Sequence, residues 1–393
     1  MLRLLALCAA LTWGLVAAGP AYAGPARAEP GAGGDRWVID AIGAAKAWKI
    51  TRGKGVTVAV LGGEHPDDGV PELAGRIERG PDMTGSLLGD ERARPGEGGT
   101  AVASLIAGSG RGGGITGIAP EAHVLSIPVV QQRPDGSFLD PEEEQDALPD
   151  SPLARGIRYA ANRGVSVICI PVAWYGVDRV DRDAVAYALS RGVVVVAAVG
   201  DDGQSDYARQ AGTSYWGFPA GYPGVMGVAA VDRNGRKTAG SSDNLSVLIA
   251  APGAQVPVAL PGGRHGTASG TGMASALVAG AAALIKAKYP DMAPELVSRA
   301  LTSTSRPHPP AGYDDKVGFG VVDAAAALTK AGELSGYGRT APVEDDAHFG
   351  KGRPLSEAPA RPGPDPVRLW IYGIAAILGA GGFAAAAVAL SRR

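Results

Sequence analysis

Cysteine and histidine are scarce in this chain. Its 393 residues include two cysteines, Cys8 and Cys169, and five histidines that stand singly along the sequence. We expect Cys8 to be lost with a leader segment, and one remaining thiol cannot form an internal disulfide. Cys169 lies in an apolar run, where a thiol is typical of a small buried hydrophobe. Metal centres need clusters of such residues, so the sequence predicts neither a metal site nor a cofactor.

An excess of charge of one sign is also absent. Lys plus Arg number 37 and Asp plus Glu 39, giving a net charge of -2. No broad positive field is available to attract a polyanion, so we expect no nucleic-acid partner. Glycine is abundant instead, with 59 residues beside 30 prolines. The 46% of apolar residues still suffices for a buried core, so we expect a folded, turn-rich domain.

The first 23 residues have the pattern of a secretory signal peptide. Arg3 is followed by an apolar stretch from Leu4 to Ala18, and then by the small-x-small site Ala21-Tyr22-Ala23. We therefore expect residues 1–23 to be removed during export. A short N-terminal extension, residues 24–35, would then precede the folded domain.

The C-terminal end predicts a membrane anchor. Residues 369–390 carry no charge and would span roughly 33 Å as a helix, enough to cross a bilayer core. The tail 391–393 ends in two arginines, which places it in the cytoplasm and the domain outside the cell membrane. Before the span, residues 331–368 are predicted to form a stalk with six prolines: Pro342, Pro354, Pro359, Pro362, Pro364 and Pro366.

Residues 36–330 remain for one folded domain. Short apolar runs such as VTVAVL (56–61), HVLSIPVV (123–130) and VVVVAAVG (193–200) alternate with alanine-rich helical segments. Strands that are apolar on both faces indicate a parallel sheet covered by helices on each side. The predicted class is therefore α/β and doubly wound, with functional residues just after the strands.

The segments at these strand ends resemble those of the subtilases, the subtilisin-like serine proteases. The clearest match is GTGMASALVAGAAALIKAKYP (270–290), against the Gly-Thr-Ser-Met-Ala-Ser-Pro helix start of the family. Five further matches follow the family's order, at residues 98–108, 117–125, 193–201, 250–253 and 318–328. This resemblance implies a subtilisin-like fold with a mostly parallel sheet.

Within the subtilases, the chain resembles the mycosins, the membrane-anchored proteases associated with type VII secretion. The opening RWVIDAIGAAKAWKITRGKGVTVAV (36–60) is similar to theirs, as is the layout of signal peptide, protease domain, stalk and span. The resemblance implies that the partners are the membrane and a type VII secretion complex or an active mycosin.

Four positions depart from the family's catalytic pattern. Gly62 stands where the orienting Asp is expected, and Gly98 stands where the His base is expected before Gly-Thr. Gly272 replaces the Ser nucleophile, and Asp201 replaces the Asn that donates to the oxyanion. Acyl transfer needs all four side chains, so we expect a pseudoprotease without catalytic residues and with a void in its cleft.

The substrate-binding edge is altered as well. The family's Ser-Leu-Gly segment corresponds here to Pro171, Val172 and Ala173. Proline has no N–H to donate to a peptide backbone, so the sequence predicts weakened peptide binding.

Two other functions stay open at this stage. One is an active endopeptidase with relocated residues, and the other is a peptide-binding receptor of the cell envelope. The polar residues available for relocation are Glu64, His65, Asp67, Asp68, His265, Ser269, Thr271 and Ser275. We expect His265 in a loop and residues 64–68 in a solvated turn.

Overall fold

A computed structural model describes residues 27–28, 36–84, 95–130, 150–336 and 366–392. The chain divides into two compact units, Met1–Tyr337 and Gly338–Arg393. The predicted signal peptide and most of the predicted stalk lie outside the described residues.

A parallel sheet of seven strands forms the centre of the first unit. The strands are β2 (Thr57–Gly62), β3 (Ile77–Arg79), β4 (His123–Pro128), β5 (Val167–Ile170), β7 (Val194–Ala198), β9 (Met226–Val231) and β10 (Ile249–Pro252). Their order is β10-β9-β7-β5-β2-β4-β3, and every neighbouring pair is parallel. After β2 the chain forms β3 at one edge and returns to β4, and then crosses to β5 and continues outward to β10. The two halves of the sheet therefore meet at β2, which marks the switch point where sites of open α/β sheets form.

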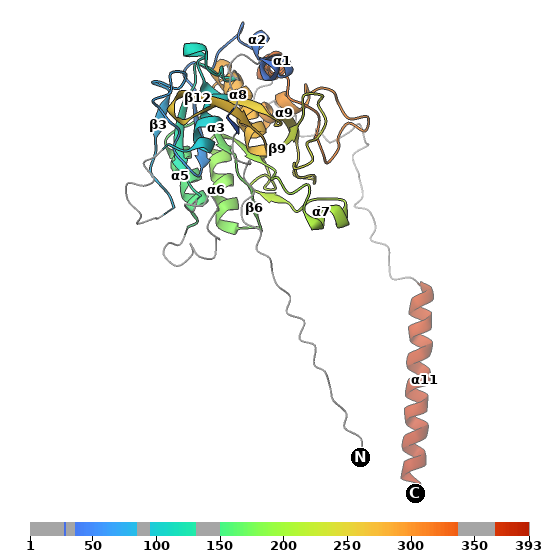
Figure 1. The fold of residues 1–393 in the computed structure, drawn as a ribbon. Coiled ribbons are helices and arrows are strands. Elements are labelled where there is room, and N and C mark those ends of the chain that lie inside the picture. Colours follow the sequence, from blue (N-terminus) through green and yellow to red (C-terminus); the bar gives the residue numbers. More distant parts are fainter. Residues whose placement is uncertain (1–26, 29–35, 85–94, 131–149, 337–365, 393) are drawn as a thin grey trace, which may run out of the picture. The chain divides into compact units, whose positions relative to one another are not determined.

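Side chains alternate between the two faces of this sheet and build two apolar cores. Val60 packs into one core, whereas its neighbour Leu61 packs into the other. Helices cover both faces, as the sequence predicts (Figure 1). The four that flank the sheet are α3 (Glu97–Ala107) and α8 (Thr271–Lys288) on the first face, and α5 (Pro152–Asn162) and α6 (Arg179–Ser190) on the second.

Helix α8 is buried along most of its length. Residues 271–286 are all buried, and the helix contacts β2, β5, β7, β9 and β10. Its alanine-rich sequence lets it lie close to the sheet, and the lack of a polar face lets it be buried on all sides. Lys286, at its C-terminal end, donates to the carbonyl oxygens of Gly192, Pro290 and Met292, which satisfies a buried ammonium group.

Smaller elements complete the first unit. A second sheet has the order β1-β12-β11, and β6 pairs with β8. The bounds are β1 (Arg27–Ala28), β6 (Trp174–Tyr175), β8 (Gly217–Phe218), β11 (Val256–Leu260), β12 (Arg264–Ala268), α1 (Trp37–Ala41), α2 (Ala44–Ala47), α7 (Asp206–Ala211) and α9 (Pro294–Thr302), with 3₁₀ turns η3 (Arg111–Gly113) and η4 (Pro261–Gly263).

The folded unit extends beyond the predicted boundary at residue 330. Helix α10 (Ala324–Ser335) continues to Ser335, and Ala331 and Leu334 are buried in the first core. The predicted stalk therefore starts too early by about five residues, because these apolar side chains continue the helical stripe. In the second unit, α11 (Pro366–Ser391) contains Leu369–Ser391, which is long and apolar enough to cross a membrane, the one such helix among the described residues.

The close packing of β9 can be tested at Gly227. A Cβ at this position would overlap the backbone carbonyl oxygen of Ser246, whereas a Cβ at Gly240 would meet nothing within 4 Å. We expect Gly227→Ala to lower the melting temperature of the full chain in detergent by about 5 °C or more, and Gly240→Ala to leave it within about 1 °C. Equal melting temperatures for the two variants would contradict this packing.

Candidate functional site

Three of the predicted site positions meet at the carboxyl edge of the large sheet. Gly62 ends β2, Pro171 follows β5, and Gly272 is the second residue of α8. A Cβ placed on Gly62 would lie 3.8 Å from the Pro171 ring, and a Cβ placed on Gly272 would lie 2.5 Å from the Pro171 carbonyl oxygen. The sequence thus identified residues that the fold brings together.

The predicted void is absent at Gly272. The distance of 2.5 Å between a Cβ at this position and the Pro171 oxygen is far below van der Waals contact. The first turn of α8 has instead approached the backbone at the end of β5, which only a residue without a side chain permits. At Gly62 the nearest atom stands at ordinary contact distance, so this position still has room for a side chain.

The Glu64 carboxylate lies against the start of α3, near Gly98. It accepts a hydrogen bond from the Gly98 backbone N–H, and a Cβ on Gly96 would collide with it. Burial raises the pKa of Glu64, while the Gly98 hydrogen bond lowers it. The expectation of a solvated turn is therefore wrong for Glu64, because the N–H groups exposed at a helix start attract a carboxylate.

Asp201 joins the end of β7 to the start of α8. Its carboxylate accepts from the Thr271 backbone N–H at 2.9 Å and from the Thr271 hydroxyl at 3.3 Å. The Thr271 hydroxyl also accepts from the Gly200 N–H at 3.3 Å. Burial raises the pKa of Asp201 to about 6, although both bonds from Thr271 lower it. Asp201 therefore serves as an acceptor at the N-terminus of an 18-residue helix.

The predicted substrate edge is buried. Pro171, Val172 and Ala173 are all buried, and the last two have no solvent exposure. Glycines facing Ala173 allow this packing, because Cβ atoms on Gly200 and Gly217 would lie 3.5 and 3.1 Å from the Ala173 Cβ. A peptide could pair with this edge only after the segments covering it had moved.

Comparisons with known proteins agree with this architecture. The subtilase family model matches residues 53–320. The chain belongs to the subtilase family. It is 35% identical to Mycosin-1 of Mycobacterium tuberculosis over 336 residues, covering 75% of this chain and 73% of that protein.

Solved structures point to the same relatives. A structure described as a serine protease MycP1, an essential component of the type VII (ESX-1) secretion system, matches with a TM-score of 0.62 and 31% identity, covering 80% of this chain and 93% of that one. Fervidolysin from Fervidobacterium pennivorans, a keratinolytic enzyme related to subtilisin, matches with a TM-score of 0.64 and 28% identity, covering 76% and 47%. The chain is therefore a mycosin-like subtilase homologue with a subtilisin-like fold. The assignment of Gly62, Gly98, Gly272 and Asp201 to the catalytic positions stays a prediction.

The alternative nucleophiles of this subtilase lie in unsuitable places. Ser275 is fully buried, donates to the Gly272 carbonyl oxygen at 2.8 Å and lies 3.9 Å from the Cys169 sulfur. Burial raises the pKa of Cys169 to about 12, consistent with the predicted small hydrophobe. Ser269 is exposed, but its hydroxyl accepts from the Gln255 N–H at 2.8 Å.

His265 lies in a strand, which corrects the loop expected from the sequence. It belongs to β12, and its Nε2 atom is 2.8 Å from a carboxylate oxygen of Glu72. Glu72 is 1% exposed and also accepts from the Ile115 N–H. The pair links the small sheet to the segment before β3. Because the two residues are far apart along the chain, the spacing of residues in the sequence did not predict the pair.

The segment 65–68 is tied to other parts of the fold rather than free in solvent. Asp67 accepts from the Gly262 N–H at 2.8 Å, and Asp68 pairs with Arg79 at 3.2 Å. The expected solvated turn therefore holds for the exposed Asp68 alone, since Asp67 connects to η4.

Sequence reasoning missed one contact between a serine and a histidine. The Nδ1 atom of His65 lies 3.1 Å from the Ser126 hydroxyl oxygen. Burial lowers the pKa of His65, and the nearby Arg79 lowers it further. Ser126 is a polar residue among the buried apolar residues of β4, which was the available signal. At 1% exposure its hydroxyl is closed to a substrate.

The raised pKa of Asp201 predicts a pH-dependent effect on stability. A carboxyl group whose pKa is raised in the folded chain holds its proton more tightly there, so its contribution falls as the pH rises from about 4 to about 6. Asn keeps an acceptor oxygen for Thr271 without the charge. We expect the unfolding free energy of Asp201→Asn, relative to the parent chain, to rise by about 2 kcal/mol between pH 4 and pH 7.

Chemical denaturation of both chains over this pH range measures the difference. Asp206→Asn, which alters an exposed carboxylate on α7, is the matched control for the loss of one charge. A difference between parent and Asp201→Asn that is flat or falls with pH would contradict the assignment.

Proposed function

We propose that this chain is a catalytically inactive mycosin-like subtilase that acts as a binding or scaffolding subunit beside a type VII secretion complex. The observation that carries the proposal is the contact at Gly272. The position predicted for the nucleophile has no side chain, and the Pro171 carbonyl oxygen occupies the space that a Cβ would need.

The polarity of the site supports this proposal. A serine protease supplies a hydroxyl nucleophile, an imidazole base and an oxyanion-binding amide donor around the reacting carbonyl. The groups that surround the same positions here are acceptors: the Glu64 carboxylate, the Asp201 carboxylate and the Pro171 carbonyl. Negative charge developing on a tetrahedral intermediate would be repelled, not stabilised.

Three serines near the predicted site argue against a relocated protease. Ser275 and Ser126 are buried, so a peptide carbonyl cannot reach either hydroxyl. Ser269 is accessible, but among the described residues its hydroxyl contacts a backbone N–H and no imidazole or carboxylate. A serine hydroxyl without an adjacent base is a weak nucleophile.

The membrane and secretion roles rest on the C-terminal helix and on the relatives. The span Leu369–Ser391 has a mean hydropathy of 2.0. In our proposal it anchors the domain to the outer face of the cell membrane, with Arg392 and Arg393 in the cytoplasm. The similarity to the type VII protease MycP1 extends over 80% of this chain, which supports a partner in the same class of membrane complex.

Labelling with a serine-reactive fluorophosphonate tests the inactive site. We expect no labelling of the full chain in membranes, because Ser126, which contacts the His65 imidazole, is buried, and the exposed Ser269 has no base beside it among the described residues. A mycosin that retains Asp, His and Ser, treated in parallel, is the positive control.

Labelling that disappears in Ser269→Ala or Ser275→Ala would establish a relocated nucleophile and reject the proposal. If labelling persists in both variants, the same test is applied to Ser126→Ala. Loss of labelling in Ser126→Ala would also reject the proposal.

Crosslinking of the full chain in its native membranes tests the scaffolding role. We expect recovery of membrane components of a type VII secretion complex. Recovery of soluble peptides that protect the Val172 and Ala173 amides from hydrogen exchange would favour a peptide receptor instead.

A further inference from the structure

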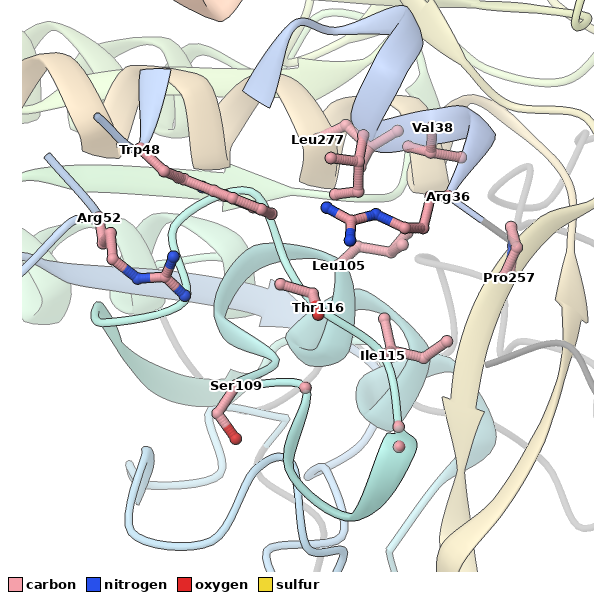
Figure 2. A pocket seen from close by; sticks show the side chains of 14 residues that line it. Arg36, Val38, Trp48, Arg52, Leu105, Ser109, Ile115, Thr116, Pro257 and Leu277 are labelled. Carbon is pink, nitrogen blue, oxygen red and sulfur yellow. The ribbon is translucent and has the colours of Figure 1, made fainter. Parts of the chain in front are cut away.

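A cavity lies between the N-terminal helices and the loop that follows α3. It is separate from the site described above. Its volume is about 490 Å³, within the range of pockets that hold small organic ligands. Residues of α1, α3, α8, β11 and the segment 109–116 line it (Figure 2). None of the residues proposed for the vestigial centre belongs to this cavity.

Apolar side chains form part of the cavity wall. Leu105 of α3 and Leu277 of α8 contribute aliphatic side chains, and Ile115 and Trp48 add to the wall (Figure 2). The Trp48 ring is held in place because its Nε1 donates to the Ile118 carbonyl oxygen at 2.8 Å. Such a surface would favour a ligand with an apolar body.

Two guanidinium groups face this apolar surface. Figure 2 shows the Arg36 head between Trp48 and Leu105, and the Arg52 head below the Trp48 ring. Arg52 lies over the Trp48 ring, 5.0 Å from its centroid, and pairs with Glu121 at 3.2 Å. No acidic residue lines the cavity among the described residues. Guanidinium groups bind carboxylates through paired N–H donors.

Further arginines lie around the Arg52 end of the cavity. Arg76 and Arg111 lie near Arg52, and the pKa of Arg76 is lowered by burial and then by Arg111. Glu121 raises the same pKa. The Glu72 carboxylate lies behind the wall, where it accepts from the Ile115 N–H. An anionic group entering the cavity would therefore relieve repulsion between like charges.

Glycines keep one wall of the cavity free of side chains. Gly110 and Gly113 have φ angles of 72° and 76°, where residues with side chains are strained. A Cβ on Gly114 would lie 2.5 Å from a carboxylate oxygen of Glu72. The open wall is thus required by the local backbone.

We propose that this cavity binds a monocarboxylate carried on an apolar body, with Arg36 and Arg52 holding the carboxylate and the Trp48 wall contacting the body. This inference is independent of the proposed function, because it involves none of the residues at the vestigial centre.

Isothermal titration calorimetry on the full chain in nanodiscs tests the proposal. The probe is N-acetyl-leucyl-leucine, and the matched ligand is its C-terminal amide, which has the same body without the charge. We expect the acid to bind at least about tenfold more tightly than the amide. Arg36→Gln and Arg52→Gln should each weaken binding of the acid by about tenfold, with no change for the amide.

Arg182→Gln, on the exposed surface of α6, is the control for the loss of one positive charge and should bind the acid as the parent chain does. Melting temperatures of all variants identify any that fail to fold, and Arg36→Lys then replaces such a variant, with intermediate affinity expected. Equal affinities for acid and amide, unchanged affinity in both arginine variants, or no binding of the acid at about 10 mM would overturn the proposal.

Discussion

The packing of α8 against the large parallel sheet is the contact on which the rest of this structure depends. The helix is buried over residues 271–286 and contacts five of the seven strands. Its axis leads to the carboxyl edge of the sheet, so its first turn meets the ends of β5 and β7. Alanine and glycine make this approach possible, and the approach in turn decides which residues fit at the edge.

The chemistry of the edge follows from that approach. Gly272 contacts the Pro171 carbonyl oxygen so closely that no side chain fits, and the free N–H of Thr271 finds an acceptor in Asp201. At the start of α3, the Glu64 carboxylate likewise accepts a hydrogen bond from a free backbone N–H. Two helix N-termini that could have faced a substrate are thus satisfied within the chain, which is the physical basis for proposing a binding subunit instead of a protease.

Periodicity and local motifs predicted the elements that depend on local sequence. The buried strands β2, β4, β5 and β7 were visible as apolar runs, and the motif GTGMAS placed Gly272 at the start of a helix. The family and fold that these motifs imply are confirmed by the match over residues 53–320.

Contacts between distant segments escaped prediction. Glu64 was expected in a solvated turn and His265 in a loop, because their partners, Gly98 and Glu72, are defined by packing and not by spacing. The prediction of a void at Gly272 was wrong, because the space beside a glycine can be filled by a neighbouring backbone as well as by solvent. The arginine-lined cavity was equally hidden, since Arg36 and Leu277 lie far apart along the chain.

The central claim is that the rearranged edge no longer supports proteolysis. Incubation of the full chain in membranes with a diverse peptide library, followed by mass spectrometry, tests it most directly. The account predicts that incubation with the folded chain and incubation with the heat-denatured chain give the same peptide products. Cleavage products that form with the folded chain alone, at reproducible sequence positions, would contradict it.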